Sequence, residues 1–168
     1  MPPMLNRWNA LAPDAAAAAI LPCCGSTAWA AGVAAARPVE TADALYELSD
    51  VVWRELPREA WLEAFASHPR IGQKHAVATA QSLAWSDGEQ SAANPDELAK
   101  AALAEGNRAY EDRFQRIFIV CATGRSATEM LAILHQRMKN DPETELLEAA
   151  EQQRQITQLR LRKWLEQD

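Results

Sequence analysis

The chain has 168 residues, of which 48% are apolar, and six of them are tryptophans. This composition excludes a disordered protein, and the length favours one domain, spanning residues 1–168, with a substantial core. The formal net charge is −6, and acidic and basic residues are mixed along the chain, so the sequence has no basic cluster typical of nucleic-acid binding. No apolar run reaches the roughly 20 residues that a membrane helix needs, so we expect no membrane partner.

Alanine is abundant, β-branched residues are sparse, and only one segment could pass for a strand. The sequence therefore predicts an all-α fold, a single-domain helical bundle. Residues 15–21 look like the core of a signal peptide, but a basic leader is missing and Pro13 and Asp14 precede them. We interpret this segment as a buried helix and expect a cytoplasmic protein.

Prolines and capping residues divide the chain into helices. A short lead-in covers residues 6–11. The expected helices cover 14–21, 26–36, 41–56, 57–68, 75–83, a stretch opened by Asn94 and Glu97, 126–139, and 141 to nearly the end. The pairs Asn94 with Glu97 and Ser126 with Glu129 are capping boxes, which are typical of helix starts.

Residues 113–122 are apolar enough to suggest a strand, but no partner strand is expected. We interpret them as buried backbone, helical at first and irregular near Cys121. The last helix should bury an apolar stripe formed by Leu146, Leu147, Ile156, Leu159, Leu161 and Leu165. The three cysteines, whose spacing fits neither a disulfide framework nor a zinc site, are expected to be buried thiols: Cys23, Cys24 and Cys121.

The stretch His68-Pro69-Arg70-Ile71-Gly72 is the most informative, because packing does not explain it. A following proline disfavours helical geometry, so the preceding helix should end at His68. The imidazole is then either a cap favoured by the helix dipole or an acid–base group that faces a cleft. His75 and His135 are expected at the surface, and the histidine spacing fits no metal site.

A second polar stretch, Ser86-Asp87-Gly88-Glu89-Gln90, follows the histidine block. Ser86 and Glu89 alone fit an ordinary capping box, whereas with Gln90 they resemble a pocket wall. Arg160 flanks the apolar stripe of the last helix. It is either a cation favoured by the helix C-terminus or a guanidinium that binds a carboxylate or ureide in bidentate fashion.

Together these blocks resemble the OHCU decarboxylases, where OHCU is 2-oxo-4-hydroxy-4-carboxy-5-ureidoimidazoline, an intermediate of urate breakdown. The resemblance rests on the motifs at 68–72, 86–90 and 156–161, the last reading Ile-Thr-x-Leu-Arg-Leu. It continues in the family's order, over almost the whole chain, through Cys23-Cys24-Gly25-Ser26, Trp29, Arg37-Pro38, Asn107-x-x-Tyr110, 118–122 and Arg137.

The resemblance implies an all-α, cofactor-free homodimer that converts OHCU to (S)-allantoin with loss of carbon dioxide. It implies three catalytic residues, with His68 as the acid/base, Glu89 beside it, and Arg160 holding substrate. The substrate contacts that it implies are Pro69, Ser86, Asp87, Gly88, Glu89, Gln90, Phe118, Ile119, Val120, Cys121, Ala122 and Arg160.

One residue departs from the family pattern. Gln115 follows the tyrosine helix where members commonly have glycine, which permits backbone shapes closed to glutamine. The approach to residues 118–122 can therefore differ. Two alternatives stay open: a non-catalytic helical domain that binds a ureide-like ligand or a partner helix, and a decarboxylase or hydrolase of another ureide.

Overall fold

The computed structural model describes residues 1–70 and 97–167. Within these ranges it contains eight α-helices, one short 3-10 helix and no strand, which confirms the predicted all-α class. The chain divides into two compact units: Met1–Ala64 with Arg154–Asp168, here the terminal unit, and Phe65–Gln153, here the central unit. The single domain expected from the sequence stays a prediction.

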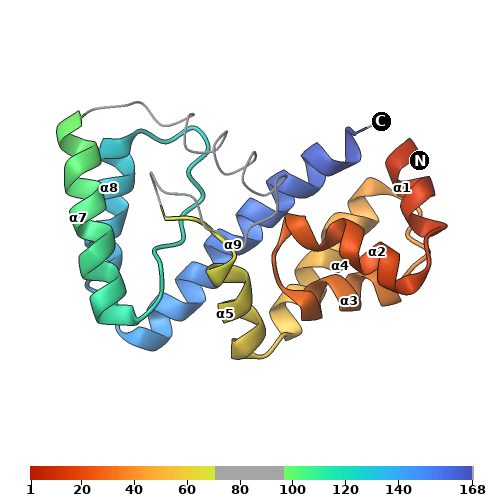
Figure 1. The fold of residues 1–168 in the computed structure, drawn as a ribbon, viewed down its shortest axis with the longest axis horizontal. Helices are drawn as coiled ribbons and strands as arrows, with labels where there is room; N and C mark the ends of the chain where they lie inside the picture. The colour runs from red at the N-terminus through yellow and green to blue at the C-terminus, as the bar shows by residue number, and fades with distance from the viewer. Residues whose placement is uncertain (71–96, 168) are drawn as a thin grey trace. The chain divides into compact units, whose positions relative to one another are not determined.

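Short helices joined by tight turns build the terminal unit (Figure 1). Its elements are α1 (Pro3–Asn9), α2 (Pro13–Ile20), the 3-10 helix η1 (Leu21–Cys23), α3 (Thr27–Ala35), α4 (Ala42–Glu55), most of α5 (Arg58–Ala66) and the C-terminal part of α9 (Pro142–Leu165). The Ser26 hydroxyl accepts from the Trp29 N–H at 3.2 Å, and the Thr41 hydroxyl accepts from the Ala44 N–H at 3.1 Å. Both predicted helix starts are thereby confirmed.

The lead-in expected over residues 6–11 lies mostly in α1 instead. This helix has only seven residues, too few for its periodicity to stand out. Its stability comes from tertiary packing, because Leu5 and Trp8 are both buried. The Trp8 ring also packs edge-on against Trp164 of α9, with centroids 5.8 Å apart.

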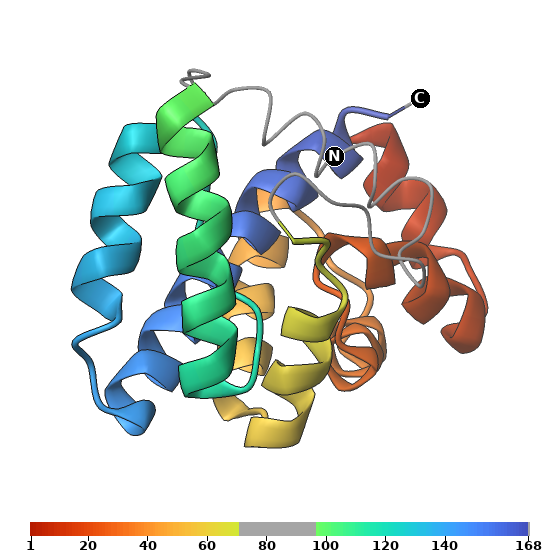
Figure 2. The same ribbon diagram turned by 60° about the vertical axis from the view of Figure 1, so that its left-hand side comes forward.

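The central unit is built on two helices that run in the same direction, α7 (Glu97–Phe114) and α8 (Ala127–Arg137). Figures 1 and 2 show them side by side, with residues 115–126 returning from the end of α7 to the start of α8. The Ser126 hydroxyl accepts from the Glu129 N–H at 3.1 Å, which confirms the helix start predicted there. Of the first box, Asn94 lies outside the described residues.

One residue of the stripe predicted for α9 lies on the other side of the helix. Leu147 is 61% exposed, whereas its neighbour Leu146 is buried. Successive residues on a helix differ by about 100° in direction, so the two neighbours of Leu146 point to opposite sides of it, and the buried face includes Glu145 but not Leu147. The face that carries Leu146 also buries Glu145, whose carboxylate has partners in the core.

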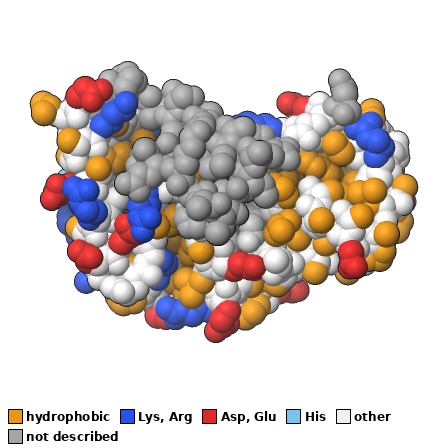
Figure 3. All heavy atoms as spheres, in the orientation of Figure 1, with side chains coloured by type: hydrophobic (Ala, Val, Ile, Leu, Met, Phe, Trp, Pro, Cys, Tyr) orange, Lys and Arg blue, Asp and Glu red, His pale blue; other side chains and the backbone are white. Residues whose placement is uncertain are grey.

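Charged side chains of both signs are mixed over α7 and α8 in the space-filling view (Figure 3). No basic stripe is visible on the described part of this face, in keeping with the charge pattern of the sequence. Among the helices that the structure describes, none is long and apolar enough to cross a membrane.

Candidate active site

His68 lies just after the end of α5 and faces inward. Its N–H donates to the Phe65 carbonyl at 3.2 Å, and Pro69 then takes the chain out of the helix, as predicted. The side chain is 7% exposed, and Pro69 is buried as well. The imidazole is therefore enclosed in the central unit. Of the other histidines, His135 is exposed as expected, and His75 lies outside the described residues.

The His68 imidazole contacts Gln153 on α9, in the same unit. The His68 Nε2 and Gln153 Oε1 atoms are 2.6 Å apart, and the Gln153 side chain is fully buried. Sequence reasoning missed this glutamine. A signal was present, because Gln153 lies four residues after Ala149 and three before Ile156, so helical periodicity places it on the buried stripe.

Residues 118–122 form a buried, irregular stretch of backbone, and each of the five is at most 8% exposed. Buried peptide groups outside helices and strands need other partners. The Cys121 N–H donates to Gln152 Oε1 at 2.9 Å, and the Ile119 carbonyl accepts from Arg137 Nη1. Side chains of α8 and α9 therefore fix this stretch, and its predicted irregular, buried character is confirmed.

Arg137, which contacts this stretch, also belongs to a buried charged cluster. Its Nε donates to Glu145 Oε1 at 2.7 Å, and the Tyr110 hydroxyl donates to the same oxygen at 2.7 Å. The guanidinium also lies 4.6 Å from the centre of the Phe118 ring. Burial, together with the bond to Glu145, raises the pKa of the Tyr110 hydroxyl well above its usual value.

Gln115 adopts the left-handed backbone conformation that favours glycine, with φ of 59°. Its N–H donates to the Glu111 carbonyl at 2.8 Å, and its side-chain amide donates to the Asp112 carbonyl at 2.8 Å. Both bonds satisfy carbonyls at the end of α7, as a C-terminal cap does. Glutamine at this position therefore takes up a backbone conformation that glycine would also allow.

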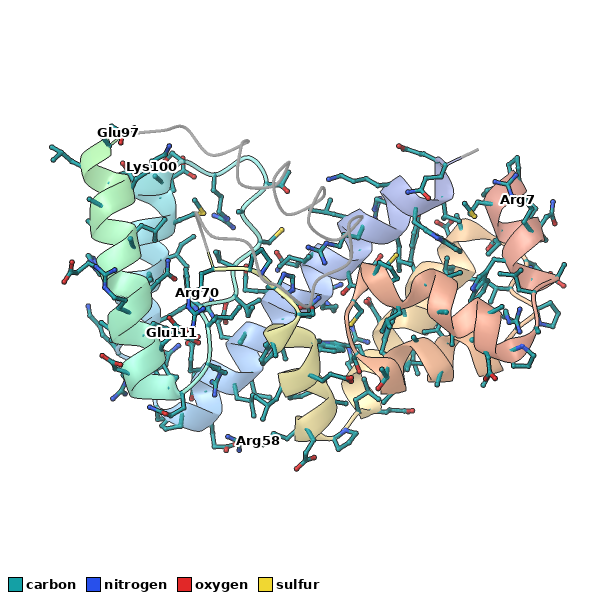
Figure 4. The ribbon with its side chains drawn as sticks, in the orientation of Figure 1. Arg7, Arg58, Arg70, Glu97, Lys100 and Glu111 are labelled. Atoms are coloured by element: carbon teal, nitrogen blue, oxygen red, sulfur yellow. The ribbon has the colours of Figure 1, made fainter. Side chains whose placement is uncertain are left out.

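An ion pair anchors the segment that follows His68. Arg70 Nε lies 2.9 and 3.0 Å from the two carboxylate oxygens of Glu111 on α7, and the two side chains meet in Figure 4. Both residues belong to the central unit, and the Arg70 side chain is half exposed. The bidentate geometry holds residue 70, two positions after the histidine, against α7.

Arg160 is buried in the terminal unit, with 1% exposure. Its Nη1 lies 3.5 Å from the Pro22 carbonyl oxygen, next to the adjacent thiols of Cys23 and Cys24. Burial raises the pKa of the Cys24 thiol to about 12, although hydrogen bonds, including that to Thr157, and the Arg160 charge act against it. A guanidinium buried this deeply differs from the solvated cations Arg162 and Lys163.

The structure thus places some of the predicted site residues in one unit, places Arg160 in the other, and does not describe the rest. His68, Pro69 and residues 118–122 all belong to the central unit, whereas Arg160 belongs to the terminal unit. The stretch 86–90, with Glu89, lies outside the described residues, so its roles stay predictions. Within residues 1–70 and 97–167, no three side chains of the metal-binding types gather into a cluster.

Comparison with known proteins gives a family match over most of the chain. The model of the OHCU decarboxylase family matches residues 9–162. The chain is 39% identical over 144 residues to the uric acid degradation bifunctional protein TTL of Arabidopsis thaliana, covering 84% of this chain and 44% of that protein. It therefore spans less than half the length of this curated relative.

Two solved structures share the fold. The crystal structure of an OHCU decarboxylase in the presence of (S)-allantoin superposes with a TM-score of 0.76 at 34% identity, covering 88% of this chain and 96% of that one. The crystal structure of an (S)-allantoin synthase gives a TM-score of 0.71 at 18% identity, covering 95% of this chain and 53% of that one, and shows the likeness of fold alone. With the family model matched from residue 9 to residue 162, the chain belongs to the OHCU decarboxylase family.

Proposed function

We propose that the protein is a carboxy-lyase that converts OHCU to (S)-allantoin, without a cofactor, in urate breakdown. The observation that carries the proposal is the buried His68, bonded to Gln153, in a chain that matches the family model over residues 9–162. Enclosure in the protein separates this imidazole from an ordinary surface cap. A buried histidine with a fixed partner has the character of an acid–base group.

The substrate supplies its own electron sink. In OHCU the carbon that bears the carboxylate is adjacent to a C=N bond of the ring. When the C–C bond to the carboxylate breaks, its electron pair moves onto the ring nitrogen and carbon dioxide leaves. One proton must then reach the neighbouring ring carbon, which carries the ureido group. The hydroxyl on the first carbon loses its proton and becomes a carbonyl, and the ring nitrogen gains a proton. The protein has to align the breaking bond with the π system, stabilise the developing charge, and deliver that proton to one face.

The family resemblance assigns these tasks to individual side chains. His68 gives the proton to the ring carbon that carries the ureido group, which fixes the (S) configuration. Glu89 orients the imidazole and favours its protonated form, and Arg160 holds the carboxylate or the developing oxyanion. The backbone of residues 118–122, with Pro69, Ser86, Asp87, Gly88 and Gln90, binds the ureido and ring amides.

Circular dichroism of the product tests this proposal. Urate is converted to OHCU by upstream enzymes, with and without this protein, and the (S)-allantoin signal is followed. We expect a fast rise with the protein and a slow, racemic product without it. His68→Asn should lower kcat by at least about 100-fold, the usual contribution of a positioned acid or base.

The matched control is His135→Asn, which changes an exposed histidine of α8 and should leave the rate unchanged. A racemic product formed at the blank rate would contradict the proposed activity and favour a binding domain. A folded His68→Asn variant with normal kcat would contradict the role of the histidine. The homodimer, which light scattering can test, and the cytoplasmic location rest on the family resemblance and the sequence.

A further inference from the structure

We propose that Gln152 is a positioning residue, which orients the backbone at Val120 so that the N–H and C=O of this one residue bind an amide edge of the substrate. The inference deepens the proposed function and rests on it for the class of ligand, a cyclic ureide. A ring amide of a ureide carries an N–H and a C=O side by side, so it is matched by one acceptor and one donor that also lie side by side.

The first step is that Val120 lies between two peptide groups whose other ends are bonded. The peptide before it includes the Ile119 carbonyl, which accepts from Arg137 Nη1. The peptide after it includes the Cys121 N–H, which donates to Gln152 Oε1 at 2.9 Å. In a planar trans peptide the C=O and the N–H point in opposite directions. The Val120 N–H therefore points away from Arg137, and the Val120 C=O points away from Gln152.

The second step is that both Val120 groups face the same edge of the chain. The side chains of Phe118, Val120 and Ala122 belong to one apolar cluster with residues of α7 and α8. Ile119 and Cys121 are buried as well, but they lie outside that cluster. Such alternation is typical of an extended backbone, in which the N–H and C=O of one residue share an edge and those of its neighbours share the opposite one. The bonded groups of Ile119 and Cys121 therefore occupy one edge, and the donor and acceptor of Val120 occupy the other.

The third step is that Val120 is buried, yet its peptide groups have no partner among the described residues. The residue is 8% exposed, and within 1–70 and 97–167 neither its N–H nor its C=O makes a hydrogen bond. The Ala122 carbonyl differs, because it accepts from the Arg125 N–H at 3.0 Å. Buried peptide groups of folded proteins are almost always bonded, so a donor and an acceptor left over on one residue indicate a ligand.

Gln152 is the part of this arrangement that can be changed with the least disturbance of the core. Arg137 also pairs with the buried Glu145, so its loss would affect the charged cluster. Besides its bond to Cys121, Gln152 contacts only the half-buried Glu148 among the described residues, with 3.4 Å between Nε2 and Oε1. Without the Gln152 acceptor, the peptide that joins residues 120 and 121 can rotate, and the Val120 C=O loses its fixed direction.

Two labelled peptides test this geometry directly. The chain contains a single Val–Cys bond and a single Ile–Val bond, so carbon-13 carbonyl and nitrogen-15 labels on these residue types give one NMR signal for each peptide beside Val120. The probe is (S)-allantoin, the product under the proposed function. At saturation we expect the Val120 carbonyl and amide-proton signals to shift downfield, while the Cys121 amide proton keeps its position. Stationary Val120 signals, or a Cys121 proton that moves in their place, would overturn the inference.

Substitutions then connect the geometry to binding. Gln152→Met keeps the length of the side chain and removes the acceptor, so the Cys121 amide proton should move upfield even without ligand. The KM for OHCU and the Kd for (S)-allantoin should rise about 10-fold with kcat unchanged, as for the loss of one or two neutral hydrogen bonds. Gln152→Glu keeps an acceptor oxygen and should restore both constants, which separates positioning from a folding defect of the methionine variant.

Gln158→Met is the matched control, because it removes another glutamine of α9, one that bonds to Tyr46 and Asp50 in the terminal unit. This variant should keep the wild-type KM and the wild-type Cys121 signal. An unchanged KM in Gln152→Met, or an equal rise in Gln158→Met, would contradict the positioning role. Failure of the proposed function looks different, because the product would then be racemic while the Val120 signals still respond to (S)-allantoin. An active protein without that response would refute the inference alone.

Discussion

Glu145→Gln tests the buried charged cluster of the central unit. The Glu145 carboxylate is fully buried and accepts from Arg137, from the Tyr110 hydroxyl at 2.7 Å and from the Asn140 amide at 3.0 Å. Glutamine keeps the shape and one acceptor oxygen but removes the negative charge. The guanidinium, only 5% exposed, then has no counter-charge among these contacts.

The loss of this negative charge weakens both the ion pair with Arg137 and the hydrogen bonds to the carboxylate. Breaking a buried ion pair by removing one partner destabilises a protein by about 3–5 kcal/mol, and glutamine, which retains hydrogen bonds, belongs at the lower end. Alternatively, hydrogen bonds to charged groups are each worth about 1–1.5 kcal/mol more than neutral ones. Over the two bonds from the neutral donors Tyr110 and Asn140, which lose their charged acceptor, this gives about 2–3 kcal/mol. We therefore expect the free energy of unfolding to fall by about 3 kcal/mol.

Urea unfolding followed by tryptophan fluorescence measures this change. With an m value near 2 kcal/mol/M, the midpoint should fall by about 1.5 M. The matched control is Glu105→Gln, which breaks an exposed pair with Arg108 whose side chains are 80% and 68% exposed. That change should cost at most about 0.5 kcal/mol. Equal midpoints for the two variants would refute a buried, charged Glu145–Arg137 pair.

Two further predictions concern the end of α7 and the thiols. Gln115→Gly should raise the free energy of unfolding by about 0.5 kcal/mol. Glycine removes the strain of the left-handed conformation, and this gain exceeds two losses: the side-chain hydrogen bond to Asp112 and the greater conformational entropy of the unfolded chain. Gln115→Val should lower it, and a valine variant as stable as wild type would contradict the positive φ. Burial raises the pKa of Cys24 from 9.0 to about 12, so the unfolded thiol ionises first and stability falls as pH rises above 9. The fall due to this thiol approaches about 1.4 kcal/mol per pH unit. Urea midpoints at pH 8 and 10.5 should show a smaller loss in Cys24→Ala, and parallel losses would contradict a buried thiol.

Local signals in the sequence predicted most of the described helices. Capping by Ser26, Thr41 and Ser126 depends on residues three positions apart, so pattern and cause lie in the same short window. The failures have a different origin. The short helix α1 depends on burial of Leu5 and Trp8 against residues far along the chain, and no local window contains that information.

The candidate site divides in the same way. The proline after His68 predicted where the helix ends, but whether the imidazole caps the helix or turns inward depends on Gln153, 85 residues away. The partners of residues 118–122 are likewise remote, since Cys121 bonds to Gln152, 31 residues away. Spacing in a sequence shows which residues share a helix face, and it does not show what that face meets.

Residues 115–126 have a consequence for how folding of this protein should be assayed. A helix closes its hydrogen bonds within itself, whereas the backbone groups of Ile119 and Cys121 are satisfied by side chains from α8 and α9. A compact state with formed helices but loose packing would keep its far-ultraviolet signal and lose these two bonds. Helix content therefore reports an upper bound on the fraction of molecules in which residues 118–122 are ordered. Amide exchange at Cys121 reports that fraction itself.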